Sequence, residues 1–169
     1  MKRILALTMA VLMMAAVLVA CGGSKDGGKS DSSAKSVDLP ALLADINSKF
    51  DISESTVDGL KKLETNDELD RYYMIAAGDI KQFAAERSSS STDFTEIVIV
   101  EANDSAAVDK IVTQMNSRLD AQRNTAKSYT PEAVEMLEKC SVKTNGNFVY
   151  LVINEKSEDI VKTIEDAIK

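Results

Sequence analysis

Ile97-Val98-Ile99-Val100 is the stretch from which the fold of this chain can be worked out. Its four β-branched residues favour a β-strand. A strand without polar alternation is typical of the centre of a sheet that is covered on both faces. We therefore expect a strand over residues 95–101. Residues 80–87 form a second expected strand, and the serine-rich stretch 88–91 joins the two.

Asn145-Gly146 marks a second pair of strands. A type I′ hairpin turn needs positive φ at both of its central residues, and asparagine and glycine both allow it. The turn connects an expected strand over residues 141–144 with another over 147–153. This register places Val142 opposite Val149.

Helices are expected before, between and after these strands, where apolar side chains recur at helical spacing. The longest helix begins after Asp104 and reaches about Tyr129. Five side chains are placed to accept a backbone hydrogen bond at the start of a helix. These expected caps are Asp38, Thr65, Asp104, Thr130 and Ser157.

The predicted fold class is therefore α+β, with a four-stranded, mainly antiparallel sheet packed by helices. The predicted order is ααββαββα: two helices, two strands, one helix, two strands and one helix. Residues 37–169 are long enough to enclose one hydrophobic core, so we expect them to form a single domain.

The start of the chain has the parts of an export signal. Lys2 and Arg3 are followed by an apolar run over residues 4–17, and Leu18-Val19-Ala20-Cys21 then has the form of a lipobox. The alternatives are an ordinary signal peptide with a coincidental cysteine, or a short membrane anchor. The apolar run is shorter than the about 20 residues that a spanning helix needs. We therefore predict a lipoprotein signal peptide over residues 1–20, recognised by signal peptidase through Leu18, Val19 and Ala20.

Cys21 is the residue that we expect to be lipidated. A diacylglyceryl group on it supplies two chains, and durable membrane anchoring requires two such signals. Residues 22–36 are rich in Gly, Ser, Lys and Asp, so residues 21–36 are expected to form a flexible tether. The expected location is the extracytoplasmic face of the cell membrane, with membrane lipid as a partner.

The charge of the chain restricts its other partners. Removal of Lys2 and Arg3 leaves 18 of the 20 basic residues against 27 acidic ones, a formal charge of −9. Such a balance argues against nucleic acid, whose phosphates are recognised by basic surfaces. We expect an envelope protein as the partner.

The chain contains no histidine. Catalytic Ser-His-Asp triads, Cys-His nucleophiles and HExxH zinc sites all need an imidazole. The acidic cluster Glu64, Asp67, Glu68 and Asp70 lacks the glycine and the spacing of a calcium loop, and helix capping explains it. We therefore expect no metal, no cofactor and no catalytic residue, and hence a protein that is not an enzyme.

Paired carboxylates are the surviving catalytic alternative, because glycoside cleavage can proceed on two of them. Glu96 and Glu101 bracket the best strand, and Glu86 lies nearby across the hairpin. The hydrolase alternative predicts that Glu96 or Glu101 lies in a pocket with a raised pKa. Since carboxylates are mostly exposed, we expect these three to face solvent.

Three residues are candidates for contacts with a ligand or partner: Glu96, Arg118 and Tyr129. Arg118 is expected to pair with an acidic group such as Glu96, or else to present its guanidinium to an anionic ligand. Cys140 would have no disulfide partner if Cys21 is lipidated. We expect it to be a buried small hydrophobe rather than a reactive thiol.

Several stretches carry a family resemblance: residues 93–101, the long helix with Arg118 and Gln122, residues 129–132 and residues 146–149. Together with the lipobox and its tether, they resemble a family of uncharacterised lipoproteins of low-GC Gram-positive bacteria, known as a domain of unknown function. The resemblance implies a location and a fold without any chemistry. We therefore predict a binding module, with a carboxylate-dependent hydrolase of cell-envelope polymer as the alternative.

Overall fold

The structure is a computed structural model that describes residues 37–52 and 59–169. The predicted signal peptide, Cys21 and the tether lie outside the described residues. No described helix is both long and apolar enough to cross a membrane.

The sheet has five strands, all paired antiparallel, in the order β1-β2-β3-β5-β4. The prediction of four strands is therefore wrong. The strand that was not predicted is Leu60–Leu63. It is short and carries Lys61 and Lys62, so it lacks the apolar pattern of a strand. The strands are β1 (Leu60–Leu63), β2 (Ile80–Ser88), β3 (Glu96–Ala102), β4 (Lys143–Asn145) and β5 (Phe148–Ile153).

β3 is the central strand, as its apolar run predicts. It lies between β2 and β5, and all of its residues are buried. Its side chains alternate between two hydrophobic clusters, with Val98 and Val100 in one and Ile97 and Ile99 in the other. Both faces of the sheet are therefore covered.

The β4–β5 hairpin turns one residue later than expected. Thr144 rather than Val142 pairs with Val149, and Gly146-Asn147 forms the loop. Gly146 has a φ of +56° and Asn147 has no positive φ, which matches a type II′ turn and not the expected type I′. The residue opposite Val149 thus shifts by two positions, from Val142 to Thr144. Because side chains alternate between the two faces of a strand, a shift of two leaves each side chain on its expected face.

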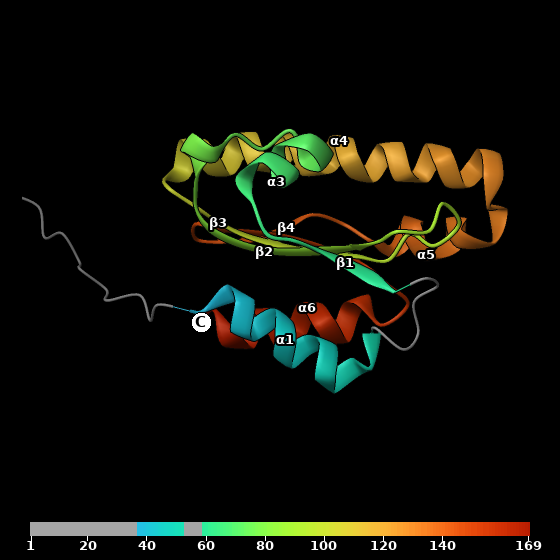
Figure 1. Cartoon of the computed structure of the whole chain (residues 1–169), viewed down its shortest axis with the longest axis horizontal. Helices are drawn as coiled ribbons and strands as arrows, with labels where there is room; N and C mark the ends of the chain where they lie inside the picture. Colours follow the sequence, from blue (N-terminus) through green and yellow to red (C-terminus); the bar gives the residue numbers. More distant parts are fainter. Residues whose placement is uncertain (1–36, 53–58) are drawn as a thin grey trace, which may run out of the picture. The chain divides into compact units, whose positions relative to one another are not determined.

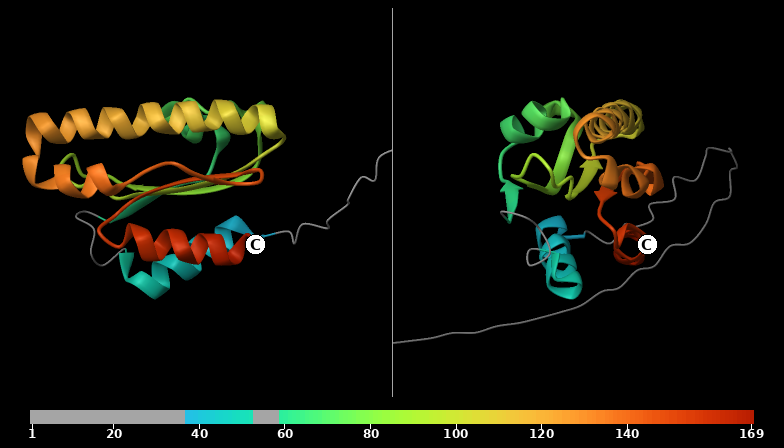
Figure 2. Two further views of the ribbon diagram at one scale, coloured as in Figure 1. Left: turned by 180° about the vertical axis from the view of Figure 1, so that it is seen from behind. Right: turned by 90° about the vertical axis from the view of Figure 1, so that its right-hand side faces the viewer.

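The described helices cover both faces of this sheet (Figure 1). The views in Figure 2 agree that α3 and α4 lie on one face and α1 and α6 on the other. The order of the described helices and strands differs from ααββαββα in two places, because β1 follows α1 and α5 follows α4. The helices are α1 (Leu39–Phe50), α3 (Asn66–Tyr73), α4 (Ser105–Tyr129), α5 (Val134–Lys139) and α6 (Ser157–Ala167), with short 3₁₀ turns at Ala77–Asp79 and Pro131–Ala133.

Three of the five expected helix caps are confirmed. The side chains of Asp38, Thr65 and Asp104 each accept a backbone hydrogen bond in the first turn. Thr130 makes no such bond, and its backbone oxygen accepts from Ala133 instead. Ser157 is the first residue of α6 rather than its cap.

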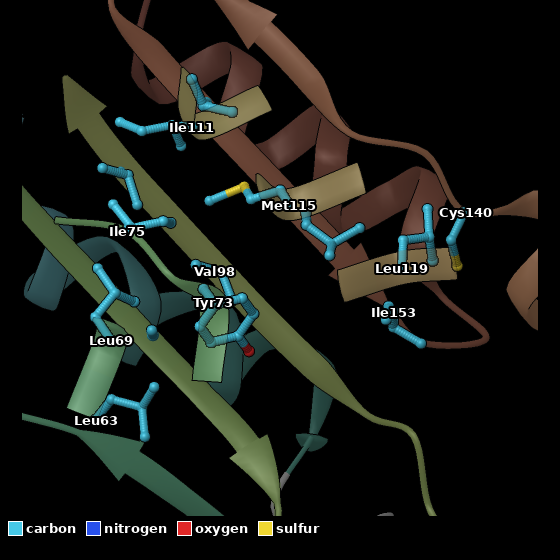
Figure 3. Packing of buried hydrophobic residues seen from close by; sticks show 14 of the residues in the cluster. Leu63, Leu69, Tyr73, Ile75, Val98, Ile111, Met115, Leu119, Cys140 and Ile153 are labelled. Carbon is cyan, nitrogen blue, oxygen red and sulfur yellow. The ribbon is translucent and has the colours of Figure 1, made fainter. Parts of the chain in front are cut away.

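The larger cluster packs α3, α4 and α5 against the sheet (Figure 3). Met115 and Leu119 of α4 meet Val98 of β3 there, and all three are at most 1% exposed. Fully burying such a side chain contributes about 1.5–3 kcal/mol. The smaller cluster packs α1 and α6 against the opposite face. Because helices cover both faces of the sheet, the polar residues of β3 lie either beneath α3 and α4 or beneath α1 and α6.

Candidate functional site

Glu96 is buried, with 1% of its surface exposed, so the expectation that it faces solvent is wrong. It is the first residue of β3 and lies on the same face as Val98, which packs beneath α3 and α4. Its carboxylate is thus held in the layer between the sheet and these helices. A buried carboxylate needs partners, because an unpaired buried charge is strongly unfavourable.

Four hydrogen bonds supply those partners. Arg118 of α4 donates from Nε to Oε2 at 3.2 Å and from Nη2 to Oε1. Tyr73 of α3 donates its hydroxyl to Oε2 at 2.9 Å, and Gln122 donates from Nε2 to Oε1 at 2.5 Å. The predicted pairing of Arg118 with Glu96 is confirmed. These bonds occupy the about four lone-pair sites of a carboxylate.

Burial and the charge of Glu96 shift the pKa values of two of its partners, Arg118 and Tyr73. Burial lowers the pKa of Arg118, but Glu96 outweighs this effect and holds that pKa above its ordinary value. Burial, with the nearby charge of Glu96, raises the pKa of Tyr73 well above its ordinary value. Tyr73 therefore stays a neutral donor, and Arg118 stays charged.

A second guanidinium lies beside this network. Arg87 of β2 places Nε 3.9 Å from Glu96 Oε1, and no group in the described part of the chain accepts a hydrogen bond from that Nε. The Arg87 guanidinium stacks 4.6 Å from the centre of the Tyr72 ring. Arg118 lies 5.6 Å from the ring centre of Tyr73. These cation–π contacts help two cations to share one carboxylate.

Glu101 lies on the opposite face of β3 and is also buried, at 9% exposure. Gln82 and Lys81 of β2 donate to its two oxygens at 2.6 and 2.5 Å. Burial raises the pKa of Glu101, but these two donors outweigh it and leave the pKa lowered. The raised pKa that the hydrolase alternative requires is not found at Glu101.

Glu86 is the third carboxylate expected to face solvent, and it too is buried, at 5% exposure. Asn47 of α1 donates from Nδ2 to Glu86 Oε2 at 2.8 Å. No described group is hydrogen-bonded to Glu86 Oε1 or to Asn47 Oδ1. Burial raises the pKa of Glu86 in spite of the bond from Asn47.

Tyr129 does not join Glu96 and Arg118. It is the last residue of α4, it is 81% exposed, and it lies eleven residues beyond Arg118. At about 1.5 Å per residue that separation is about 16 Å along the helix. The three candidate contact residues therefore do not form one site.

Cys140 is buried, at 2% exposure, as predicted for a small hydrophobe. It lies near Leu119 and Ile153 in Figure 3. Its thiol donates to the backbone oxygen of Met136 at 3.3 Å, and burial raises its pKa. Arg123 donates to the backbone oxygen of Cys140 at 2.8 Å, which ties this segment to α4.

Two adjoining clefts flank this segment, and sequence reasoning missed both. The first has a volume of about 270 Å³ and lies between residues 139–143 and α6, with Val152 and Cys140 among its lining residues. The second has a volume of about 290 Å³ and lies between α5 and residues 154–157. Lys139 and Ser157 line both clefts. No sequence motif marks them, because their lining residues come from segments that are separate in the sequence, residues 132–143 and 152–165.

The family described as domain of unknown function DUF4358 matches residues 53–154. The chain belongs to the DUF4358 family. The match spans all five strands together with α3, α4 and α5, and so includes the Glu96 network, while α1 and α6 lie outside it. No curated protein and no solved structure matches the chain.

Proposed function

We propose that this DUF4358 protein is a lipid-anchored, non-enzymatic binding module at the extracytoplasmic face of the cell membrane. A diacylglyceryl group on Cys21 is its anchor, and residues 22–36 tether the folded domain to it. The partner is another protein of the cell envelope. The two adjoining clefts beside α5 and α6 carry the proposal for binding, because ligand sites in proteins are concave and combine apolar walls with polar groups.

The state of the carboxylates supports binding over hydrolysis. The oxygens of Glu96 are occupied by donors from Arg118, Tyr73 and Gln122. A general base needs a free oxygen within hydrogen-bond reach of the proton that it removes. Neither Glu96 nor Glu101 lines either of the two clefts. The Glu96 network instead joins β3, α3 and α4 into a rigid support.

Site-specific cross-linking in living cells tests the proposal. A photoreactive amino acid replaces Ser141, which lines the first cleft, and in a separate strain it replaces Asp109, an exposed residue of α4. We expect one envelope protein to be captured from position 141 and not from position 109. Equal capture from both positions, or no capture from position 141, would contradict binding at the clefts.

The anchor is tested in the same cells with Cys21→Ala. This variant is expected to be released from the membrane or to retain an uncleaved signal, while its domain unfolds at the same denaturant concentration as the parent. Membrane fractionation and mass spectrometry of the amino terminus measure the first point. Acylation of the variant would show that the lipobox prediction is wrong.

A further inference from the structure

Asn47 of α1 and Glu86 of β2 meet in a buried contact that contains two oxygens without a hydrogen-bond partner. Asn47 donates from Nδ2 to Glu86 Oε2 at 2.8 Å. Asn47 Oδ1 and Glu86 Oε1 are both buried, and in the described part of the chain neither is hydrogen-bonded. Both atoms are acceptors when the carboxyl is charged, so the contact lacks a donor. Leaving a buried acceptor without a donor is unfavourable.

A proton on Glu86 supplies the missing donor. A protonated carboxyl donates from one oxygen and accepts at the other, whereas an amide donates from its nitrogen and accepts at its oxygen. A carboxylic acid and an amide therefore match each other through two parallel hydrogen bonds. The second bond would run from Glu86 Oε1 to Asn47 Oδ1, so that one proton gives both oxygens a partner.

No charged group among the described neighbours is paired with Glu86 Oε1. Lys62 of β1 is directly opposite Glu86, but its side chain is exposed and makes no salt bridge with a described residue. The residue opposite on β3 is Ile97, which is apolar and 0% exposed. Burial outweighs Lys62 and the donor from Asn47, and it raises the pKa of Glu86. The charged residues near the end of α1 are all exposed: Asp45, Lys49 and Asp51.

Polar contacts with β2 hold α1 near both of its ends. Near the start, Gln82 Nε2 donates to the backbone oxygen of Val37 at 2.8 Å. Near the end, the contact is that between Glu86 and Asn47. The last turn of α1, residues 47–50, has no buried apolar side chain, so it depends on its polar contacts. The buried apolar residues of α1 all precede this turn: Leu39, Leu42, Leu43 and Ile46.

We propose that Glu86 and Asn47 form a pH-sensitive latch on the last turn of α1. In the closed latch, protonated Glu86 donates from Oε1 to Asn47 Oδ1 while its Oε2 accepts from Asn47 Nδ2. Loss of the proton to solvent removes the first of these bonds, leaves both oxygens without a donor and loosens the turn. The earlier turns stay in place, because burial of four apolar side chains contributes more than one hydrogen bond.

The latch joins the family domain to the helix that follows the proposed tether. Glu86 lies within the residues that match DUF4358, whereas Asn47 lies outside them. The docking of α1 would thus respond to the pH outside the membrane. This inference goes beyond the proposed binding function and does not depend on it.

Infrared spectroscopy of the full chain in detergent micelles tests the proton. The carboxylic acid band of Glu86 is the band that is missing in Glu86→Gln, and it is followed from pH 4 to pH 9. We expect this band to lose half of its intensity above pH 4.5, the ordinary pKa of a glutamate. A midpoint at or below that value would overturn the proposal.

Hydrogen–deuterium exchange of the same preparation tests the latch. Exchange is compared one pH unit below and one above the measured midpoint, after correction for the intrinsic effect of pH. We expect the amides of residues 47–50 to exchange roughly fivefold to a hundredfold faster above the midpoint, as for buried polar groups that lose a partner. The amides of Leu42 and Leu43 should change by less than about twofold, because the opening is local. Equal acceleration of both groups would overturn the latch.

Two glutamate variants provide matched comparisons. Glu86→Gln should keep the latch closed at every pH, because its amide donates to Asn47 Oδ1 and accepts from Asn47 Nδ2. Its last turn should therefore exchange at the slow parental rate on both sides of the midpoint. Glu132→Gln removes an exposed carboxylate from the 3₁₀ turn after α4 and should keep the parental pH dependence. Persistence of that dependence in Glu86→Gln, or its loss in both variants, would refute the role of Glu86.

A metal ion held by the two oxygens is the competing explanation. Magnesium or calcium chloride is added to the parent above the midpoint and compared with sodium chloride at equal ionic strength. We expect no change in the exchange of residues 47–50. Slower exchange with either divalent salt in the parent, but not in Glu86→Gln, would replace the proton with a cation and overturn the proposal.

Discussion

Glu96 of β3 and Arg118 of α4 form a two-bond ion pair in the layer between the sheet and the longest helix, although 22 residues separate them in sequence. The Glu96 side chain is 2% exposed and that of Arg118 is 19% exposed. Tyr73 adds α3 to the same carboxylate. One acidic residue therefore fixes the relative positions of three elements of the DUF4358 fold.

Arg118→Met is expected to lower the free energy of unfolding by about 3–5 kcal/mol, because it leaves a buried carboxylate without its main counter-charge. Urea unfolding followed by circular dichroism measures the change. Lys162→Met is the control, since it breaks an exposed pair with Asp166 that should contribute little to stability. The double variant Glu96→Gln/Arg118→Met should lose less stability than the sum of its single variants. Strict additivity would contradict the pairing.

Glu86→Gln is expected to stabilise the domain at neutral pH. Burial raises the pKa of Glu86 above the ordinary 4.5. At a pH between the ordinary and the raised pKa, Glu86 is protonated in the folded state but has lost its proton in the unfolded chain. Stability falls with rising pH wherever the folded state binds more protons. The penalty is thus absent below about pH 4.5, grows as the pH rises through the raised pKa, and is complete above it.

Urea unfolding at pH 4, 6 and 8 measures this effect as the difference between Glu86→Gln and the parent. The difference should favour the variant and increase with pH. Glu101→Gln provides the opposite sign, because the lowered pKa of Glu101 makes its charged form stabilising above the ordinary pKa. A Glu86→Gln difference that is constant across the three pH values would refute a raised pKa.

Cys140 should react with N-ethylmaleimide only when the domain opens. Its burial and raised pKa both suppress the thiolate, which is the nucleophilic form. The measurement is alkylation followed by mass spectrometry in a Cys21→Ala background, with and without denaturing urea. Labelling in native buffer at the rate seen in urea would show that the thiol is accessible and reactive.

Gly146→Ala is expected to destabilise the β4–β5 hairpin by about 1–2 kcal/mol, because a side chain is disfavoured at positive φ. Gly146 has a φ of +56°, whereas Gly78 has no positive φ, and neither has another atom within 4 Å of an added Cβ. Gly78→Ala is therefore the matched control and should change stability by less than about 0.5 kcal/mol. Thermal unfolding of the two variants compares them directly, and equal losses would exclude backbone strain as the cause.

Local patterns predicted much of the fold. The apolar run of β3 identified the central strand, and the caps at Asp38, Thr65 and Asp104 located the starts of three helices. These features depend on contacts within a few residues, so the amino-acid order alone contains them. The predicted turn of the hairpin lies one residue from the observed turn, because Gly146 is a central residue in both.

The remaining features of the fold were decided by the tertiary structure, because they depend on interactions between segments that are distant in the sequence. β1 has no strand pattern of its own and forms only because β2 offers it a partner. The burial of Glu96 depends on Arg118 and Tyr73, which come from two different helices. The two clefts exist only because α5, α6 and the segments 139–143 and 152–157 are brought together. The sequence by itself determined the central strand and three helix starts, whereas packing between distant segments decided which charges are buried and where the clefts form.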